Sequence, residues 1–305
     1  MIESSIIKSE SNVMSKVKDY LQLVKLSLSI MVVFSSVISY LLAPKVVEYD
    51  WWTILLLFAG GMLVTGSANA INQVVEKDTD AMMKRTSKRP VAAGRMSVQE
   101  GWAFAILTGA MGVFILGNYF NWLAAGLAVL SLFLYAFIYT PLKKVNSIAV
   151  LMGAIPGALP CLIGWAAGDD KLSTGGWVLF GIQFFWQFPH FWAIAWIAHS
   201  DYTRVGFKLL PADKGPTKFT ALQTVIYSLL LVPVTMIPYF TGMCEYGSVA
   251  GMIGLSLIVI ANLFMITRSI RLYREMDVTS ARKVMFGSYM YLPVILLALL
   301  MSKNG

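Results

Sequence analysis

The sequence predicts an all-α membrane protein in which nine transmembrane helices form one bundle. Three observations predict this class: 57% of the 305 residues are hydrophobic, only 13% are charged, and the mean hydropathy is +0.69. A soluble domain carries about 25% charged residues, so a lipid bilayer is the expected solvent for most of this chain. Lipid offers no hydrogen bonds to a bare backbone, and apolar stretches that cross it therefore form helices.

Apolar stretches follow one another along almost the whole chain. The first lies near 22–43 and is followed by stretches near 52–75, 101–119, 121–141, 147–168, 176–199, 219–242, 246–267 and 284–302. Each is close to the roughly 20 residues that a bilayer requires. The third and fourth are joined by only a few residues around Asn118, which predicts a tight helical hairpin. We expect a single integral-membrane domain over 1–305, with a polar cytoplasmic tail at 1–20.

The basic residues predict how this domain is oriented. Only Lys45, Lys171 and Lys303 fall on one side of the predicted membrane. By the positive-inside rule the amino terminus is cytoplasmic and the carboxyl terminus lies outside. The other 21 of the 24 lysines and arginines fall on the cytoplasmic side: Lys8, Lys16, Lys18, Lys25, Lys77, Lys84, Arg85, Lys88, Arg89, Arg95, Lys143, Lys144, Arg204, Lys208, Lys214, Lys218, Arg268, Arg271, Arg274, Arg282 and Lys283.

Charge and targeting signals narrow the setting further. A net charge of +8 is compatible with a nucleic-acid partner, but these bases orient membrane helices and no nucleic acid is expected. The amino terminus has no short apolar core before a cleavage site and is too acidic for a transit peptide, which favours a bacterial plasma membrane. Cys161 and Cys244 lie deep in apolar sequence and are interpreted as packing residues.

The segment after the second apolar stretch carries a cluster of acids and amides. Asn72, Glu76 and Asp80 are spaced four apart and share one helical face, with Asn69 one turn earlier. Asp78 lies roughly opposite on an ideal helix and contributes only if the helix unwinds there. Mg²⁺ prefers oxygen ligands and commonly bridges one or two carboxylates to substrate phosphates.

A basic run directly behind the acids includes Arg85 and Arg89, whose planar guanidinium groups suit phosphate oxygens. The pattern predicts a metal–diphosphate site at the membrane surface. The alternative is a solvated helix end, which the amides within the apolar span disfavour because polar groups there are costly.

Two motifs resemble those of the UbiA superfamily of intramembrane prenyltransferases. That family's first motif, Asn-x3-Asp-x3-Asp, stands here as Asn72-x3-Glu76-x-Asp78-x-Asp80, and its Tyr-x3-Lys motif stands as Tyr139-x3-Lys143. The resemblance implies a helical bundle with a central cavity, a Mg²⁺ cofactor and a prenyl diphosphate held partly by the second motif. Glu76 departs from the family pattern, and its extra methylene could pass a metal contact to Asp78.

The acceptor follows from the sixth stretch. Members that act on aromatic acceptors carry a second Asp-x3-Asp, whereas here Asp201 is followed four residues later by Val205. The segment WQFPHFWAIAWIAHSDYTRVGFKLLP at 186–211 instead resembles the haem-specific branch of the superfamily. This resemblance implies transfer of a farnesyl group from farnesyl diphosphate to the vinyl group of haem B, giving haem O. It also implies haem A synthase or a terminal oxidase assembly as partners. A quinone or benzoate acceptor, or a membrane transporter, remain alternatives.

His190 lies midway along the sixth stretch, after Pro189 and among aromatic residues that include Trp186. A neutral imidazole suits haem iron or proton transfer, although a lone histidine can also be a packing residue. Small residues at 59–61, 153 and 157 leave room for a prenyl tail or for close helix packing.

The residues and the resemblance together predict catalytic roles for Asn72, Glu76, Asp80, Lys143 and His190. They predict substrate binding by Arg85, Arg89, Tyr139, Asn69, Asp78 and Trp186, and metal binding by Asn72, Glu76, Asp78 and Asp80.

Overall fold

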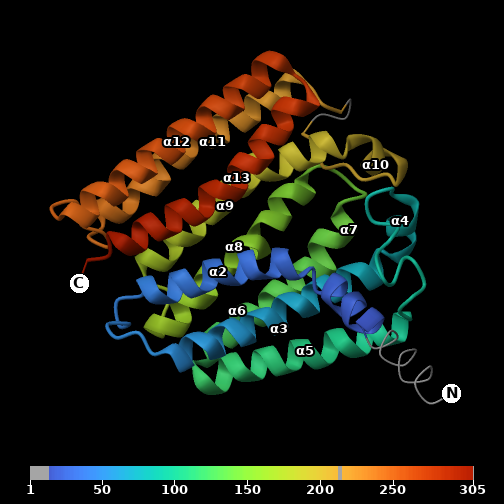
Figure 1. Cartoon of the computed structure of the whole chain (residues 1–305), viewed down its shortest axis with the longest axis horizontal. Coiled ribbons are helices and arrows are strands. Elements are labelled where there is room, and N and C mark those ends of the chain that lie inside the picture. Colours follow the sequence, from blue (N-terminus) through green and yellow to red (C-terminus); the bar gives the residue numbers. More distant parts are fainter. Residues whose placement is uncertain (1–13, 212–214, 305) are drawn as a thin grey trace.

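Long helices make up most of the chain in the computed structural model, which describes residues 14–211 and 215–304 (Figure 1). Short helical segments connect them near one end of the bundle: α4 (Lys77–Met82), the π-helix η1 (Leu134–Tyr139), α7 (Thr140–Leu142) and α10 (His199–Arg204). Lys8, Lys214 and the first part of the predicted tail at 1–20 lie outside the described residues. The long helices are α2 (Leu26–Leu42), α3 (Trp51–Val75), α5 (Val98–Tyr119), α6 (Trp122–Phe133), α8 (Ile148–Asp169), α9 (Thr174–Ile197), α11 (Lys218–Phe240), α12 (Val249–Glu275) and α13 (Val278–Met301). The predicted all-α class is confirmed.

The expected count of nine spans is wrong. Within the described residues, seven helices are long and apolar enough to cross a membrane, or eight if a bent pair counts as one span. The α9 helix has 24 residues but is not among them, because Gln183, Gln187 and His190 lower its hydropathy. The bent pair is Met14–Leu23 with α2, whose axes differ by 49°. The apolar stretch predicted near 22–43 therefore contains a break at its start, between Leu23 and Leu26.

Side-chain caps begin several of these helices where the sequence changes from polar to apolar. Asp50 accepts hydrogen bonds from the backbone amides of Trp52 and Thr53 at the start of α3. Asn121 caps α6 through the amide of Ala124, directly after α5 ends. These caps satisfy backbone donors that a helix leaves free at its first turn. The predicted hairpin between α5 and α6 is confirmed.

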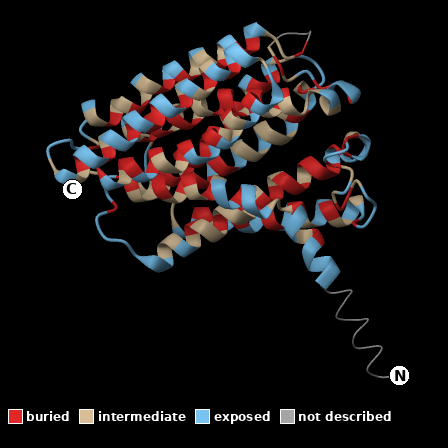
Figure 2. Ribbon diagram, turned by 45° about the horizontal axis from the view of Figure 1, so that its top comes forward, coloured by how far each residue is buried: buried red, intermediate tan, exposed pale blue. Residues whose placement is uncertain are grey.

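Buried residues line the helix sides that face one another, and exposed residues lie on the outer sides (Figure 2). Many of the exposed residues are large and apolar, such as Ile106, Phe114 and Met290. Such an outer surface suits lipid rather than water.

The small-residue positions serve close packing. A Cβ atom at Gly153 would lie 2.6 Å from the Tyr139 ring, and one at Gly157 would overlap the Gln187 amide. Gly60 and Gly61 are likewise covered by apolar side chains. The sequence left two roles open for these glycines, room for a prenyl tail or close helix packing. In the structure they allow close helix packing.

The two ends of the described chain lie at opposite ends of the bundle, and α4, α7 and α10 lie at the end that carries the amino terminus (Figure 1). The connections that hold the predicted acids and bases are therefore gathered on one side.

Candidate active site

The α3 helix ends in a slight break that keeps three polar side chains on one face. Glu76 separates α3 from α4 with φ −94° and ψ 13°, yet the amide of Asp80 still donates to the Glu76 carbonyl at 2.7 Å. The helical direction therefore continues, and Asn72, Glu76 and Asp80 are all buried on the same side. Asp78 is exposed on the opposite side and takes no part in this group.

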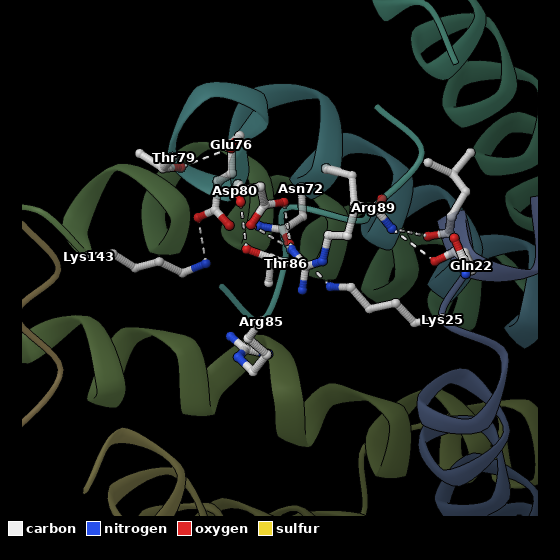
Figure 3. Close-up of polar contacts among 12 residues, drawn as sticks. Gln22, Lys25, Asn72, Glu76, Thr79, Asp80, Arg85, Thr86, Arg89 and Lys143 are labelled. Carbon is white, nitrogen blue, oxygen red and sulfur yellow. Dashed lines mark hydrogen bonds and ion pairs between the residues drawn. The ribbon is translucent and has the colours of Figure 1, made fainter. Parts of the chain in front are cut away.

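Each of these three residues meets a cation from a different part of the chain (Figure 3). Lys143 Nζ lies 2.7 Å from Glu76 Oε1, and an Arg89 guanidinium nitrogen lies 2.6 and 2.9 Å from the two Asp80 oxygens. Lys25 Nζ donates to Asn72 Oδ1 at 3.2 Å. Two carboxylates, one amide and three cations thus form a compact group, called here the acid–base cluster.

A π-helical turn and a glycine place Lys143. The η1 segment ends at Tyr139, whose ring lies 4.4 Å from Lys143 Nζ and packs against Gly153 of α8. The Lys143 carbonyl accepts the Lys208 amide at 2.7 Å, which ties the following turn to the loop after α10. Lys143 is therefore buried with its ammonium group aimed at Glu76.

The turn after α4 places Arg89. Thr86 Oγ1 donates to the Asp80 carbonyl at 3.0 Å, and the Arg89 amide donates to the Thr86 carbonyl at 2.9 Å. These bonds fold 83–89 back over the end of α4, so that the guanidinium group reaches Asp80. Because Asp80 is fully buried, its negative charge requires such a partner.

Lys25 belongs to the acid–base cluster, although its sequence position indicated only an orienting charge. It occupies the break before α2 with φ 50°, a left-handed conformation. At this break, two side-chain amides of α3 donate to backbone carbonyls. Asn69 donates to the Val24 carbonyl at 3.0 Å, and Gln73 donates to the carbonyls of Gln22 and Leu23. The intramembrane amides thus hold a helix break that turns Lys25 toward Asn72.

Arg85 lies beside α10 rather than within the acid–base cluster. Its amide donates to Asp201 at 3.3 Å, and its guanidinium group donates to the Tyr202 hydroxyl at 3.3 Å. Asp201, the acid left from the missing second motif, therefore faces the loop that carries Arg85 and Arg89.

His190 and Trp186 form a separate group at the α9–α13 contact. Their rings stack with centroids 4.8 Å apart, and His190 Nδ1 lies 2.7 Å from Ser288 Oγ on α13. No hydrogen bond in the described chain joins this pair to the acid–base cluster.

Comparison with known proteins decides the family. Residues 32–292 match the UbiA prenyltransferase family. The chain belongs to the UbiA prenyltransferase family. The expected family resemblance is thereby confirmed.

Curated relatives of this UbiA family member align over nearly its whole length. A Cytophaga hutchinsonii protein called protoheme IX farnesyltransferase is 40% identical and covers 95% of this chain and 99% of its own. A Flavobacterium johnsoniae protein of the same name is 38% identical over 97% and 98% of the two chains.

Solved UbiA structures share the fold. A digeranylgeranylglyceryl phosphate synthase superposes with a TM-score of 0.75 and 21% identity, covering 94% of this chain and 98% of its own. A UbiA homologue from Archaeoglobus fulgidus, bound to GPP and Mg²⁺, gives a TM-score of 0.70 at 15% identity over 92% and 99%.

The donor set of this UbiA site fits a Mg²⁺ ion that shares its ligands with a diphosphate. Among described residues, no three or more His, Cys, Asp or Glu side chains gather closely enough to hold a metal alone. Glu76, Asp80 and Asn72 supply two carboxylates and an amide oxygen, and Mg²⁺ commonly completes such a set with substrate phosphates. Asn72 Nδ2 is buried without a hydrogen-bond partner in the described chain, and a phosphate oxygen would satisfy it.

Proposed function

We propose that this chain transfers the farnesyl group of farnesyl diphosphate to a vinyl group of haem B, giving haem O and diphosphate. The observation that carries the proposal is the end-to-end similarity to proteins called protoheme IX farnesyltransferase. The acid–base cluster supports it, because its three cations surround the face that carries Glu76 and Asp80. A diphosphate could take the three cations as its partners, while the divalent cation that enters with it takes the two carboxylates.

The diphosphate is bound by Lys143 and Arg89, with Lys25 as a third cation and Tyr139 and Arg85 nearby. Asn72, Glu76 and Asp80 would hold Mg²⁺, which neutralises phosphate charge and so improves the leaving group. Phosphate contacts to Lys143 and Arg89 would release the Asp80 and Glu76 carboxylates, which would then be available to hold the metal. Lys143 and Arg89 then stabilise negative charge that grows on the departing oxygen.

The reaction breaks the bond between carbon 1 of the farnesyl chain and the diphosphate oxygen. The haem vinyl carbon supplies the electron pair for the new carbon–carbon bond, and diphosphate leaves with the electrons of the broken bond. A water molecule adds to the resulting cation and loses a proton, which leaves a hydroxyl group beside the farnesyl chain. The apolar bundle keeps bulk water from the allylic cation before the vinyl group reacts.

His190 and Trp186 would contact the porphyrin. Trp186 offers a flat surface, and a buried imidazole suits either iron or a proton in transfer. This pair lies on α9, and its separation from the acid–base cluster suits two substrates of different chemistry.

We also propose a setting for the reaction. A multi-span chain with its bases on the amino-terminal side suits a bacterial plasma membrane, with the acid–base cluster at the cytoplasmic surface. Haem A synthase or a terminal oxidase assembly would receive the product.

The test is an assay of purified protein with Mg²⁺, farnesyl diphosphate and either haem B or 4-hydroxybenzoate, with products identified by mass spectrometry. We expect haem O from haem B alone, loss of product with EDTA, and loss with Asp80→Ala. Glu48→Ala, which removes an exposed acid at the other end of the bundle, is the matched control and should keep full activity. Product from benzoate alone, or from neither acceptor, contradicts the proposal.

A further inference from the structure

The α13 helix supplies a partner for His190. Ser288 is fully buried, and its Oγ lies 2.7 Å from His190 Nδ1. The same Oγ lies 2.6 Å from the Met285 carbonyl, one turn earlier on α13. The Ser288 carbonyl in turn accepts a hydrogen bond from Trp186 Nε1 at 2.8 Å. One residue of α13 thus holds both members of the stacked pair on α9.

The two contacts of the Ser288 hydroxyl decide the form of the imidazole. A carbonyl oxygen can only accept, so the 2.6 Å contact with Met285 requires the single hydroxyl proton between the two oxygens. The hydroxyl then has only lone pairs left for His190. Nδ1 must therefore carry a hydrogen and donate it to Ser288, and the lone pair of the ring lies on Nε2.

His190 Nε2 remains available for a further contact. No described residue makes a hydrogen bond with it. Trp186 lies parallel to the ring at an angle of 15°, and Tyr289 packs edge-on with centroids 5.0 Å apart. Both rings pack against the imidazole, while Nε2 keeps its lone pair and has no hydrogen-bond partner among the described residues.

We propose that Ser288 is a positioning residue that fixes the His190 tautomer whose Nε2 ligates the iron of the porphyrin substrate. The inference rests on the proposed function, because haem is taken as the acceptor. Histidines that bind metals generally donate their other ring hydrogen to an oxygen of the protein, which fixes both tautomer and ring orientation. Ligation through Nε2 would set where the porphyrin lies and so which edge of it receives the farnesyl group.

The test measures ferric haem B binding to detergent-solubilised protein through the optical spectrum. We expect wild-type protein to show an imidazole-ligated spectrum that His190→Ala abolishes. Ser288→Ala should weaken haem binding about 10- to 100-fold and raise KM for haem, with KM for farnesyl diphosphate unchanged. Ser288→Thr, which keeps the hydroxyl, should restore most of the spectrum.

Ser228→Ala is the matched control, because it removes another buried serine hydroxyl, bonded to Ser269 at 2.8 Å between α11 and α12. It should leave the haem spectrum unchanged. An unchanged spectrum and affinity in Ser288→Ala, or no imidazole ligation in wild-type protein that makes haem O, overturns this inference and leaves the proposed function intact. Absence of haem O in a protein that still ligates haem overturns the proposed function instead.

If Ser288→Ala does not fold, a second measurement identifies the ring nitrogen of His190 that ligates the iron. The chain has only two histidines, His190 and His199. In a His199→Asn protein that carries ¹⁵N at histidine Nε2, the labelled histidine nitrogen is therefore His190 Nε2. Labelled nitrogen coupled to the iron supports the assignment, and coupling to unlabelled Nδ1 overturns it.

Discussion

Lys143 and Glu76 form a buried ion pair to which we assign both a stabilising and a catalytic role. Both side chains are 8% exposed, so each charge depends on the other. Lys143→Met leaves a buried carboxylate without its cation, which we expect to destabilise the protein by about 3–5 kcal/mol. We also expect loss of diphosphate binding and at least a 100-fold loss of activity, measured by thermal unfolding and by the haem O assay.

The double variant Lys143→Met with Glu76→Gln separates the two effects. Removal of both charges should recover most of the stability, because no unpaired charge remains buried. Activity should stay low, since neither the phosphate cation nor the metal carboxylate is restored. Recovery of activity together with stability would show that the pair is purely structural.

The two aspartates of the first motif differ in burial and therefore in expected role. Asp80 is fully buried against Arg89, whereas Asp78 is exposed without an ion pair in the described chain. We expect Asp80→Asn to lower activity at least 100-fold and to raise the Mg²⁺ concentration needed for half-maximal rate. Asp78→Asn should change neither value more than about threefold, as is usual for an exposed surface position. Equal losses in both variants would mean that α4 unwinds when substrate binds.

At the scale of elements, the break before α2 is held by side chains of α3. Asn69 donates to the Val24 carbonyl and to Ser29 Oγ, and both bonds are lost in Asn69→Ala. The Val24 carbonyl keeps the Ser29 hydroxyl as a donor at 2.6 Å. Each lost hydrogen bond costs about 0.5–1.5 kcal/mol, so thermal unfolding should shift by the sum of the two. Because the break carries Lys25, KM for farnesyl diphosphate should also rise.

Asn118→Ala, on α5, is the matched control for Asn69→Ala. Asn118 is an exposed amide that bonds only within its own helix, to the Phe114 carbonyl at 3.0 Å. Its loss should change stability by less than about 0.5 kcal/mol, as expected for a surface position. A larger effect of Asn118→Ala than of Asn69→Ala would contradict the role given to the α3 amides.

Elements and their partners were predictable to different degrees. Hydropathy predicted the long helices, and the four-residue spacing predicted that Asn72, Glu76 and Asp80 share a face. The break at Lys25 carries no glycine or proline signal, and only tertiary hydrogen bonds from α3 reveal it. Ser288 could not be linked to His190 from spacing, since 98 residues separate them. Patterns along a chain report periodic faces, whereas contacts between distant helices depend on the packed fold.

At the scale of the whole molecule, the chain ends at the side opposite to the acid–base cluster (Figure 1). Lys303 contributes to this far side by donating to the carbonyls of Leu41, Ala43 and Val46. These bonds tie the end of the described chain to the end of α2. Most bases lie on the other side, and that imbalance predicts a cytoplasmic cluster.

Fusion proteins in a bacterial host can measure this orientation. We expect alkaline phosphatase, which is active only after export, to be active when fused after Ser302 or inserted at Gly247, between α11 and α12. Alkaline phosphatase inserted at Met276, between α12 and α13, should be inactive. Green fluorescent protein inserted at the same position should be fluorescent. The reason is that the α12–α13 connection lies among Arg268, Arg271, Arg274, Arg282 and Lys283, whereas the α11–α12 connection around Gly247 contains no base. The reverse pattern would place the acid–base cluster outside, where neither the positive-inside rule nor a cytoplasmic diphosphate substrate could account for it.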